Sequence, residues 1–142
     1  MKKLITVFLI LFSGCCSEDG FSQKVVEQKN GQVFYIPFDI EFITGRSEVI
    51  FESLAFCEAN VKESEFAKLL VKTTNIYPIG NARAKIMFKD NVYFISREGM
   101  VTDFRNTYIL RNKEDFYKLI KGSLHANPVN KNISKSEVNL CE

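Results

Sequence analysis

The sequence has no tryptophan and only one histidine, His125. An imidazole that acts as a general base or metal ligand must be held beside partners, and only Ser123 and Asn127 lie near His125 in a polar stretch. The chain also lacks Gly-x-Ser-x-Gly, His-x-x-x-His, Ser-x-x-Lys, Cys-x-x-Cys and a glycine-rich phosphate loop. We therefore expect no enzyme, no metal site, no cofactor and no evident small-molecule substrate.

An excess of charge of one sign is also missing. Without Lys2 and Lys3, the chain carries 17 Lys plus Arg against 17 Asp plus Glu, and the two signs alternate along the sequence. Nucleic-acid binding proteins normally present a net basic surface, so nucleic acid is not an expected partner. With 142 residues and 46% hydrophobic residues, the chain is expected to form one small globular domain.

The N-terminal apolar run is too short to span a membrane. Residues 4–12 are apolar, and nine residues of helix rise about 14 Å against a hydrocarbon core of ~30 Å. Lys2 and Lys3 precede this run and the small residues Ser13 and Gly14 follow it. This order of basic, apolar and small residues predicts an export signal rather than a permanent span.

The residues at the end of this signal are Phe12-Ser13-Gly14-Cys15, which resemble the lipobox of bacterial lipoproteins, with Phe12 where Leu is usual. The resemblance implies that Cys15 becomes the lipid-bearing N-terminus of a membrane-anchored envelope protein. The following residue, Cys16, is not the Asp that retains such proteins at the inner membrane, which implies the outer membrane in a Gram-negative host. Ordinary signal cleavage after Ser17 or Ser22 is the alternative, and it would give a soluble periplasmic or secreted protein.

Composition divides the remainder into three parts. We expect a flexible tether at 15–32 after the signal at 1–14, a single domain at 33–122, and a polar C-terminal tail at 123–142. Cys57 and Cys141 are the two cysteines left for the mature domain, and in an oxidising compartment they are expected to form a disulfide. Such a bond would close a loop of about 84 residues and stabilise the domain by roughly 4–5 kcal/mol. A buried free Cys57 with an unpaired tail thiol is the alternative.

Hydrophobic periodicity predicts an α+β fold. Strict alternation predicts a strand at 38–42, which we expect to form a hairpin with 49–57, and alternation from 84 to 110 predicts a meander. Asn60 and Glu63 look like a capping box and predict a helix at 61–73. A second helix is expected between Asn112 and Gly122. Together these elements predict a small antiparallel sheet, a hairpin plus a meander, with about two helices packed on one face.

Aromatic and arginine side chains near the turns of the meander are the candidate recognition residues. Tyr93, Arg97, Arg105 and Tyr108 are expected to form one edge, because such residues are typical anchors of protein interfaces. The plainer interpretation is a set of mixed-charge turns with tyrosines at the rim of the sheet.

The candidate carboxylates are Asp39, Glu41 and Asp103, which a hydrolase would use. Two outward acidic residues on a half-buried strand are also the ordinary expectation for Asp39 and Glu41.

These observations lead to one preferred function and two alternatives. The preferred function is a non-enzymatic, membrane-anchored envelope lipoprotein that binds another protein, for example of the immunity or exclusion type. The alternatives are a structural or assembly accessory of an envelope secretion or pilus machine, and a carboxylate-dependent hydrolase.

Overall fold

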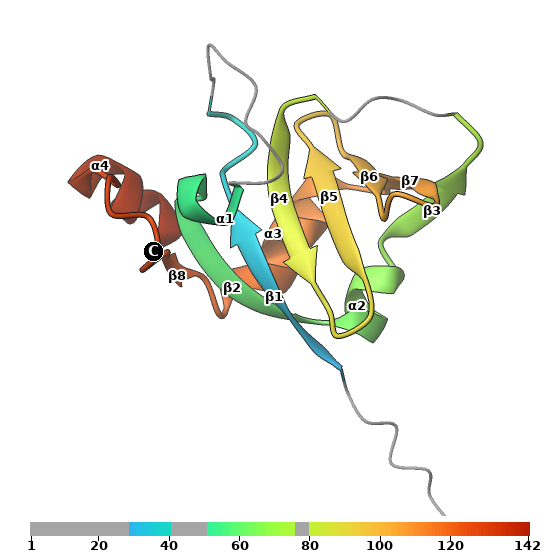
Figure 1. The fold of residues 1–142 in the computed structure, drawn as a ribbon, viewed down its shortest axis with the longest axis horizontal. Helices are drawn as coiled ribbons and strands as arrows, with labels where there is room; N and C mark the ends of the chain where they lie inside the picture. The colour runs from blue at the N-terminus through green and yellow to red at the C-terminus, as the bar shows by residue number, and fades with distance from the viewer. Residues whose placement is uncertain (1–28, 41–50, 76–79) are drawn as a thin grey trace, which may run out of the picture.

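The computed structural model describes residues 29–40, 51–75 and 80–142, and these form an eight-stranded antiparallel sheet with short helices around it (Figure 1). The strand order is β3-β7-β6-β5-β4-β1-β2-β8. The elements are β1 (Asn30–Tyr35), α1 (Phe51–Leu54), β2 (Cys57–Lys62), α2 (Glu63–Ala67), β3 (Leu70–Thr73), β4 (Ala82–Met87), β5 (Val92–Ser96), β6 (Met100–Thr102), β7 (Thr107–Leu110), α3 (Lys113–Lys121), β8 (His125–Ala126), α4 (Lys135–Val138) and the 3₁₀ turn η2 (Asn139–Cys141).

The predicted fold class, a small sheet with about two helices packed on one face, is wrong. The described residues are mostly sheet, and their helices are short: α3 has nine residues and α2 has five. The sheet is larger than expected because three of its strands lie in segments with other predictions. The end of β2 and all of β3 lie in the predicted helix, and β8 lies in the predicted tail. The error therefore lies in segments whose strands find partners far away in the sequence.

The segment at 61–73, predicted as a helix, contains the end of β2, the short helix α2 and β3. Cys57, Ala59 and Val61 are buried while the residues between them are more exposed, which is the alternation of a strand. Asn60 lies in β2 opposite Gln32 and caps no helix. Pairing with β1 satisfies the backbone groups of 57–62, and this tertiary gain outweighs the local capping signal.

The prediction of a strand at 38–42 is also wrong for residues 38–40, the part that the structure describes. β1 ends at Tyr35, Pro37 follows, and Phe38 and Asp39 form a turn in which the amide of Ile40 bonds to the carbonyl of Pro37 at 3.3 Å. Proline has no N–H to donate to a ladder, which explains why the strand stops before it. In the expected partner strand at 49–57, Phe51–Leu54 form the helix α1 instead. The strand β1 pairs with β2 and β4.

The four strands from β4 to β7 form the meander that alternation indicates. Each strand pairs with the next in antiparallel register, and the order continues through β7 to the edge strand β3. α3 then begins after Asn112, whose side chain accepts a hydrogen bond from the backbone N–H of Glu114 at 2.9 Å. The local signals are sufficient here because strands adjacent in sequence are also adjacent in the sheet.

The main core lies between the sheet and α3, which passes behind β1 and β4 in Figure 1. Phe116 and Ile120 of α3 are fully buried, and the Phe116 ring packs edge-on against Tyr35 and Phe66 at centroid distances of 6.1 Å. Phe88 and Tyr93 continue the same aromatic cluster, with ring centroids 6.1 Å apart. These aromatic rings supply much of the bulk of this core layer.

The opposite face of the sheet is covered near its centre by α1. Phe51 of α1 is fully buried and packs edge-on against Phe94 of β5, with ring centroids 6.5 Å apart. Glu52 forms a partly buried ion pair with Lys85 of β4, whose ammonium also lies 5.7 Å from the centre of the Phe94 ring. α1 thus covers the middle of this face, beside the strands of the meander.

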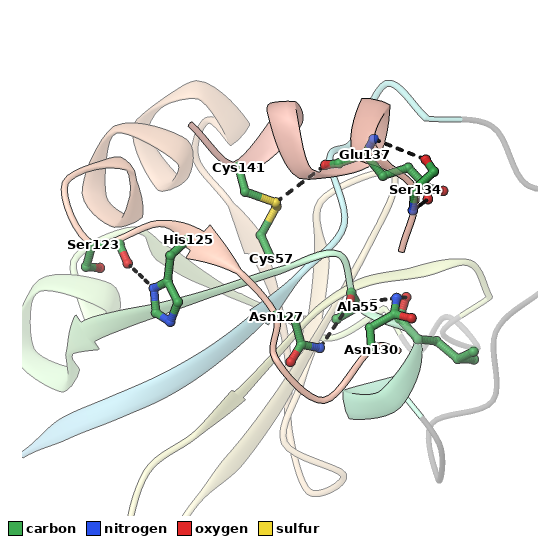
Figure 2. Close-up of a disulfide and its surroundings, with 10 residues drawn as sticks. Ala55, Cys57, Ser123, His125, Asn127, Asn130, Ser134, Glu137 and Cys141 are labelled. Carbon is green, nitrogen blue, oxygen red and sulfur yellow. Dashed lines mark hydrogen bonds between the residues drawn. A yellow bond between two sulfur atoms is a disulfide. The ribbon is translucent and has the colours of Figure 1, made fainter. Parts of the chain in front are cut away.

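The C-terminal segment is fastened to the sheet by side-chain amides and a disulfide (Figure 2). The side chain of Asn127 is 2% exposed, and its Nδ2 donates to the carbonyls of Glu52 and Ala55 at 2.7 and 2.9 Å. The Nδ2 of Asn130 also donates to Ala55, at 3.2 Å. A disulfide joins Cys141 to Cys57 of β2. The amides thereby satisfy carbonyls at the end of α1 that would otherwise lack partners.

The structure also bears on the expected divisions of the chain. β1 begins at Asn30, within the range expected for the tether, and the range expected for the tail contains β8 and α4. The predicted signal peptide and the lipobox-like residues up to Cys15 lie outside the described residues.

We expect Gly31→Ala to destabilise the domain by about 1–3 kcal/mol, because a new side chain would overpack the core. A Cβ at Gly31 would overlap Cε1 of Phe88, whose ring is held against Phe66 and Tyr93. Gly122→Ala is the matched control, because a Cβ there has no neighbour within 4 Å. Urea unfolding measures both, and equal stabilities for the two variants would contradict this packing.

Candidate functional site

The four predicted recognition residues lie at two ends of the meander. Tyr93 lies near the start of β5 and its ring is 6.4 Å from that of Tyr108, while Arg105 lies in the β6–β7 turn beside the same end. Arg97 follows the last residue of β5 and lies at the other end, in a cleft with Lys113. The structure thus brings three of the four residues together, and the expected single edge is not one surface.

The β6–β7 turn, residues 103–106, is held by a dense set of hydrogen bonds. Oδ1 of Asp103 accepts from the backbone N–H groups of Arg105 and Asn106 at 2.8 and 2.6 Å. The hydroxyl of Thr102 accepts from the N–H of Phe104 at 3.0 Å and donates to the carbonyl of Asn106 at 3.1 Å. Two side chains at the start of the turn therefore fix its backbone conformation.

Phe104 at the tip of this turn is the most unusual residue of the described chain. Its φ is +67°, in the left-handed region that a bulky side chain rarely adopts. Its side chain is 65% exposed, and one side of the ring rests edge-on against the buried Phe94 at a centroid distance of 5.4 Å. The turn therefore holds a large apolar ring in solvent at a conformational cost.

Two more exposed apolar side chains share the face of Phe104. Val71 of β3 and Ile109 of β7 lie opposite each other in the ladder and are 44% and 40% exposed. Thr107 pairs with Thr102, which pairs with Phe94, so the alternation of β7 places Ile109 on the face that carries the Phe94 ring. We call Val71, Phe104 and Ile109 the apolar end of the sheet.

Arg105 and the tyrosines of the opposite face add polar groups near the apolar end. Burial raises the pKa of both Tyr93 and Tyr108, and the negative charge of Asp103 raises each pKa further, so both phenols are neutral near neutral pH. Partial burial also acts to raise the pKa of Asp103, but the N–H groups of Asn106 and Arg105 outweigh it and lower this pKa below its usual value. The turn therefore carries a stable carboxylate beside the cation of Arg105.

The candidate carboxylates are not brought together. Asp39 lies in the cleft with Arg97, whereas Asp103 lies in the hollow beside Arg105 at the other end of the meander. Both oxygens of Asp103 accept hydrogen bonds within its own turn. Glu41 lies outside the described residues. The geometry thus offers no pair of facing carboxylates among Asp39 and Asp103.

His125, Cys57 and Cys141 lie in surroundings that support the fold rather than a reaction. His125 lies on the edge strand β8, exposed, with Nδ1 2.9 Å from the carbonyl oxygen of Ser123. Cys57 and Cys141 are buried and joined as a disulfide. Among the residues the structure describes, no three His, Cys, Asp or Glu side chains cluster as a metal site would require.

Comparison with protein-family models, with curated proteins and with solved structures finds no match to this chain. Within the described ranges, none of the helices has the length and apolar character needed to cross a bilayer.

Phe104, Val71 and Ile109 were missed by sequence reasoning. One signal was present: Thr102-Asp103-Phe104-Arg105-Asn106 contains turn-forming Asp and Asn around a phenylalanine. An aromatic residue inside such a turn is more exposed than one in a strand. Val71 offered no such signal, because it lay in a segment predicted as helix.

Asp103 should make the stability of the domain depend on pH in a defined direction. Because its folded-state pKa is lowered, its contribution is present above the unfolded-state pKa of about 3.9 and is lost as pH falls through the folded-state value. Asp103→Asn should therefore be less stable than the parent near neutral pH, and the difference should shrink toward about pH 2.5. Urea unfolding at both pH values measures it, and a difference that grows in acid would exclude this role.

Proposed function

We propose that this protein is a non-enzymatic envelope lipoprotein that binds another protein through the apolar end of its sheet. The main support for this proposal is the exposure of Phe104. This residue is 65% exposed and is held at a positive φ by the hydrogen bonds of its turn. A large apolar side chain that is kept in solvent at the expense of backbone strain is best explained by a partner that covers it.

The energetics of interfaces support this proposal. Aromatic and arginine side chains contribute disproportionately to binding, and Phe104 and Arg105 are adjacent. Asp103 and Thr102 hold the turn in one conformation, so little entropy would be lost when a partner binds. Val71 and Ile109 would then supply the apolar surroundings that exclude water from the centre of the contact.

The proposed location supports the same function. The signal-like N-terminus and the lipobox-like residues before Cys15 would place the domain on a membrane of the envelope, outside the reducing cytoplasm. A lipid anchor fixes a small domain where an incoming or neighbouring protein would meet it. An immunity or exclusion lipoprotein is the version of this function that we favour.

Phe104→Ala should weaken binding of the partner by about 2 kcal/mol, roughly 30-fold, while leaving the stability of the domain nearly unchanged. The measurement is crosslinking and recovery from envelope extracts, followed by titration of the recovered partner. Val129→Ala is the matched control, because Val129 is 53% exposed but lies in the C-terminal segment. If both variants bind the partner as well as the parent does, the apolar end is not the interface.

Cys15→Ser should release the protein from membranes into the soluble fraction, because the lipid would have no thiol to modify. Fractionation of cells that express the parent and the variant measures the effect. Cys16→Ser is the control, since the neighbouring cysteine is not the lipid acceptor in this interpretation. A Cys15→Ser protein that still sediments with membranes would contradict the anchor.

A further inference from the structure

A second feature of the described residues is a cleft at the end of the meander opposite Phe104, beside the β5–β6 turn. It is an open cleft of about 600 Å³, formed by the turn after β1, the first turn of α3, the β5–β6 turn and η2. This volume lies within the range of small-ligand sites. The proposed partner surface uses none of these residues, so the cleft calls for a separate explanation.

The floor of the cleft is aromatic. Tyr35, Phe38 and Tyr117 line it, and Tyr35 packs against Phe38 and Tyr117 at centroid distances of 5.7 and 6.4 Å. Burial raises the pKa of Tyr35, so its phenol stays neutral. Leu140 adds an apolar wall from the C-terminal segment. An apolar or aromatic group of a ligand would therefore find matching surfaces on more than one side.

The basic residues of the cleft are more buried than its acidic residues. Arg97 and Lys113 are half-buried, whereas Asp39 and Glu114 are exposed. Within the described chain, the ammonium of Lys113 donates one hydrogen bond, 3.2 Å to the carbonyl oxygen of Arg97, and lies 5.5 Å from the centre of the Phe38 ring. An ammonium has three hydrogens to donate, so Lys113 retains donor capacity toward the cleft. The ammonium of Lys113 thus lies beside the aromatic floor of the cleft.

We infer that this cleft binds an aromatic carboxylate, with the carboxylate at Lys113 and the ring against Phe38 and Tyr117. A charge-assisted hydrogen bond from Lys113 would fix the carboxylate, and stacking would hold the ring. Asp39 and Glu114 at the rim would disfavour ligands that carry a second negative charge. This chemistry occurs at the C-terminal residue of a peptide and in free aromatic acids.

The C-terminal segment completes this site. Cys57 lies opposite Tyr35 in the ladder of β1 and β2, and its disulfide to Cys141 holds the adjacent Leu140 at the cleft. The wall supplied by Leu140 therefore depends on a contact between residues 84 positions apart. The inference is independent of the proposed partner surface, since the two sites share no residue.

The test uses the protein with its disulfide intact and three probes: N-acetyl-phenylalanine, its neutral amide, and N-acetyl-Ala-Ala-Phe with a free carboxylate. Binding is followed by NMR shifts of the backbone amides of Phe38, Tyr117 and Leu140. We expect the acid to bind about tenfold more tightly than the amide. Tighter binding of the peptide than of the free acid identifies a peptide C-terminus as the ligand; equal affinities identify a small aromatic acid.

Two variants and one control give the test its specificity. Lys113→Gln should remove the preference for the acid over the amide, and Leu140→Glu should weaken binding of the acid at least tenfold by placing a negative charge at the cleft. Lys121→Gln, an exposed lysine at the end of α3, should bind as the parent does. Unchanged shifts with every probe at millimolar concentration, equal affinity for acid and amide, or an unaffected Lys113→Gln variant would each overturn the inference.

Discussion

The disulfide between Cys57 and Cys141 is the contact on which the architecture of this small domain depends. Cys57 lies at the start of β2, the strand that pairs with β1 on one side and with β8 on the other. The bond therefore joins the C-terminal segment to β2, the strand next to the edge strand β8, and Asn127 and Asn130 hold the intervening chain to the carbonyls around α1. A domain of this size buries a limited core, so a covalent link that restricts the unfolded chain is a large part of its stability.

This constraint connects the fold to the proposed location and function. A disulfide persists in an oxidising compartment, which agrees with the proposal that residues 1–14 direct export. The two ends of the meander carry different surfaces. At one end the exposed Phe104 lies in a rigid turn, and at the other end Lys113 lies in the aromatic cleft. The sheet keeps these two surfaces apart, so a membrane-anchored domain would be able to engage a protein partner and a small carboxylate separately.

The sequence allowed prediction of elements that depend on local signals. Alternation from 84 to 110 identifies the meander, and Asn112 and Gly122 delimit α3, because neighbouring residues supply the partners of both. β2 could not be identified in the same way, since its strand partners are distant in the sequence. Ala59 and Val61 pair with residues of β1, and β8 pairs with the start of β2. The structure places Tyr93, Arg105 and Tyr108 near the β6–β7 turn and Arg97 elsewhere, and their role in recognition stays a prediction. The turn-forming residues around Phe104 indicate a turn, but its positive φ is visible only in the structure.

Equilibrium unfolding in urea, with and without a thiol reductant, tests most directly the claim that the Cys57–Cys141 bond supports this fold. Intact mass, measured in parallel, establishes which form is present. For a loop of 84 residues, reduction is predicted to lower the free energy of unfolding by roughly 4 kcal/mol, with loss of order in the C-terminal segment. A native protein whose mass shows two free thiols, or an oxidised and a reduced form of equal stability, would contradict the account.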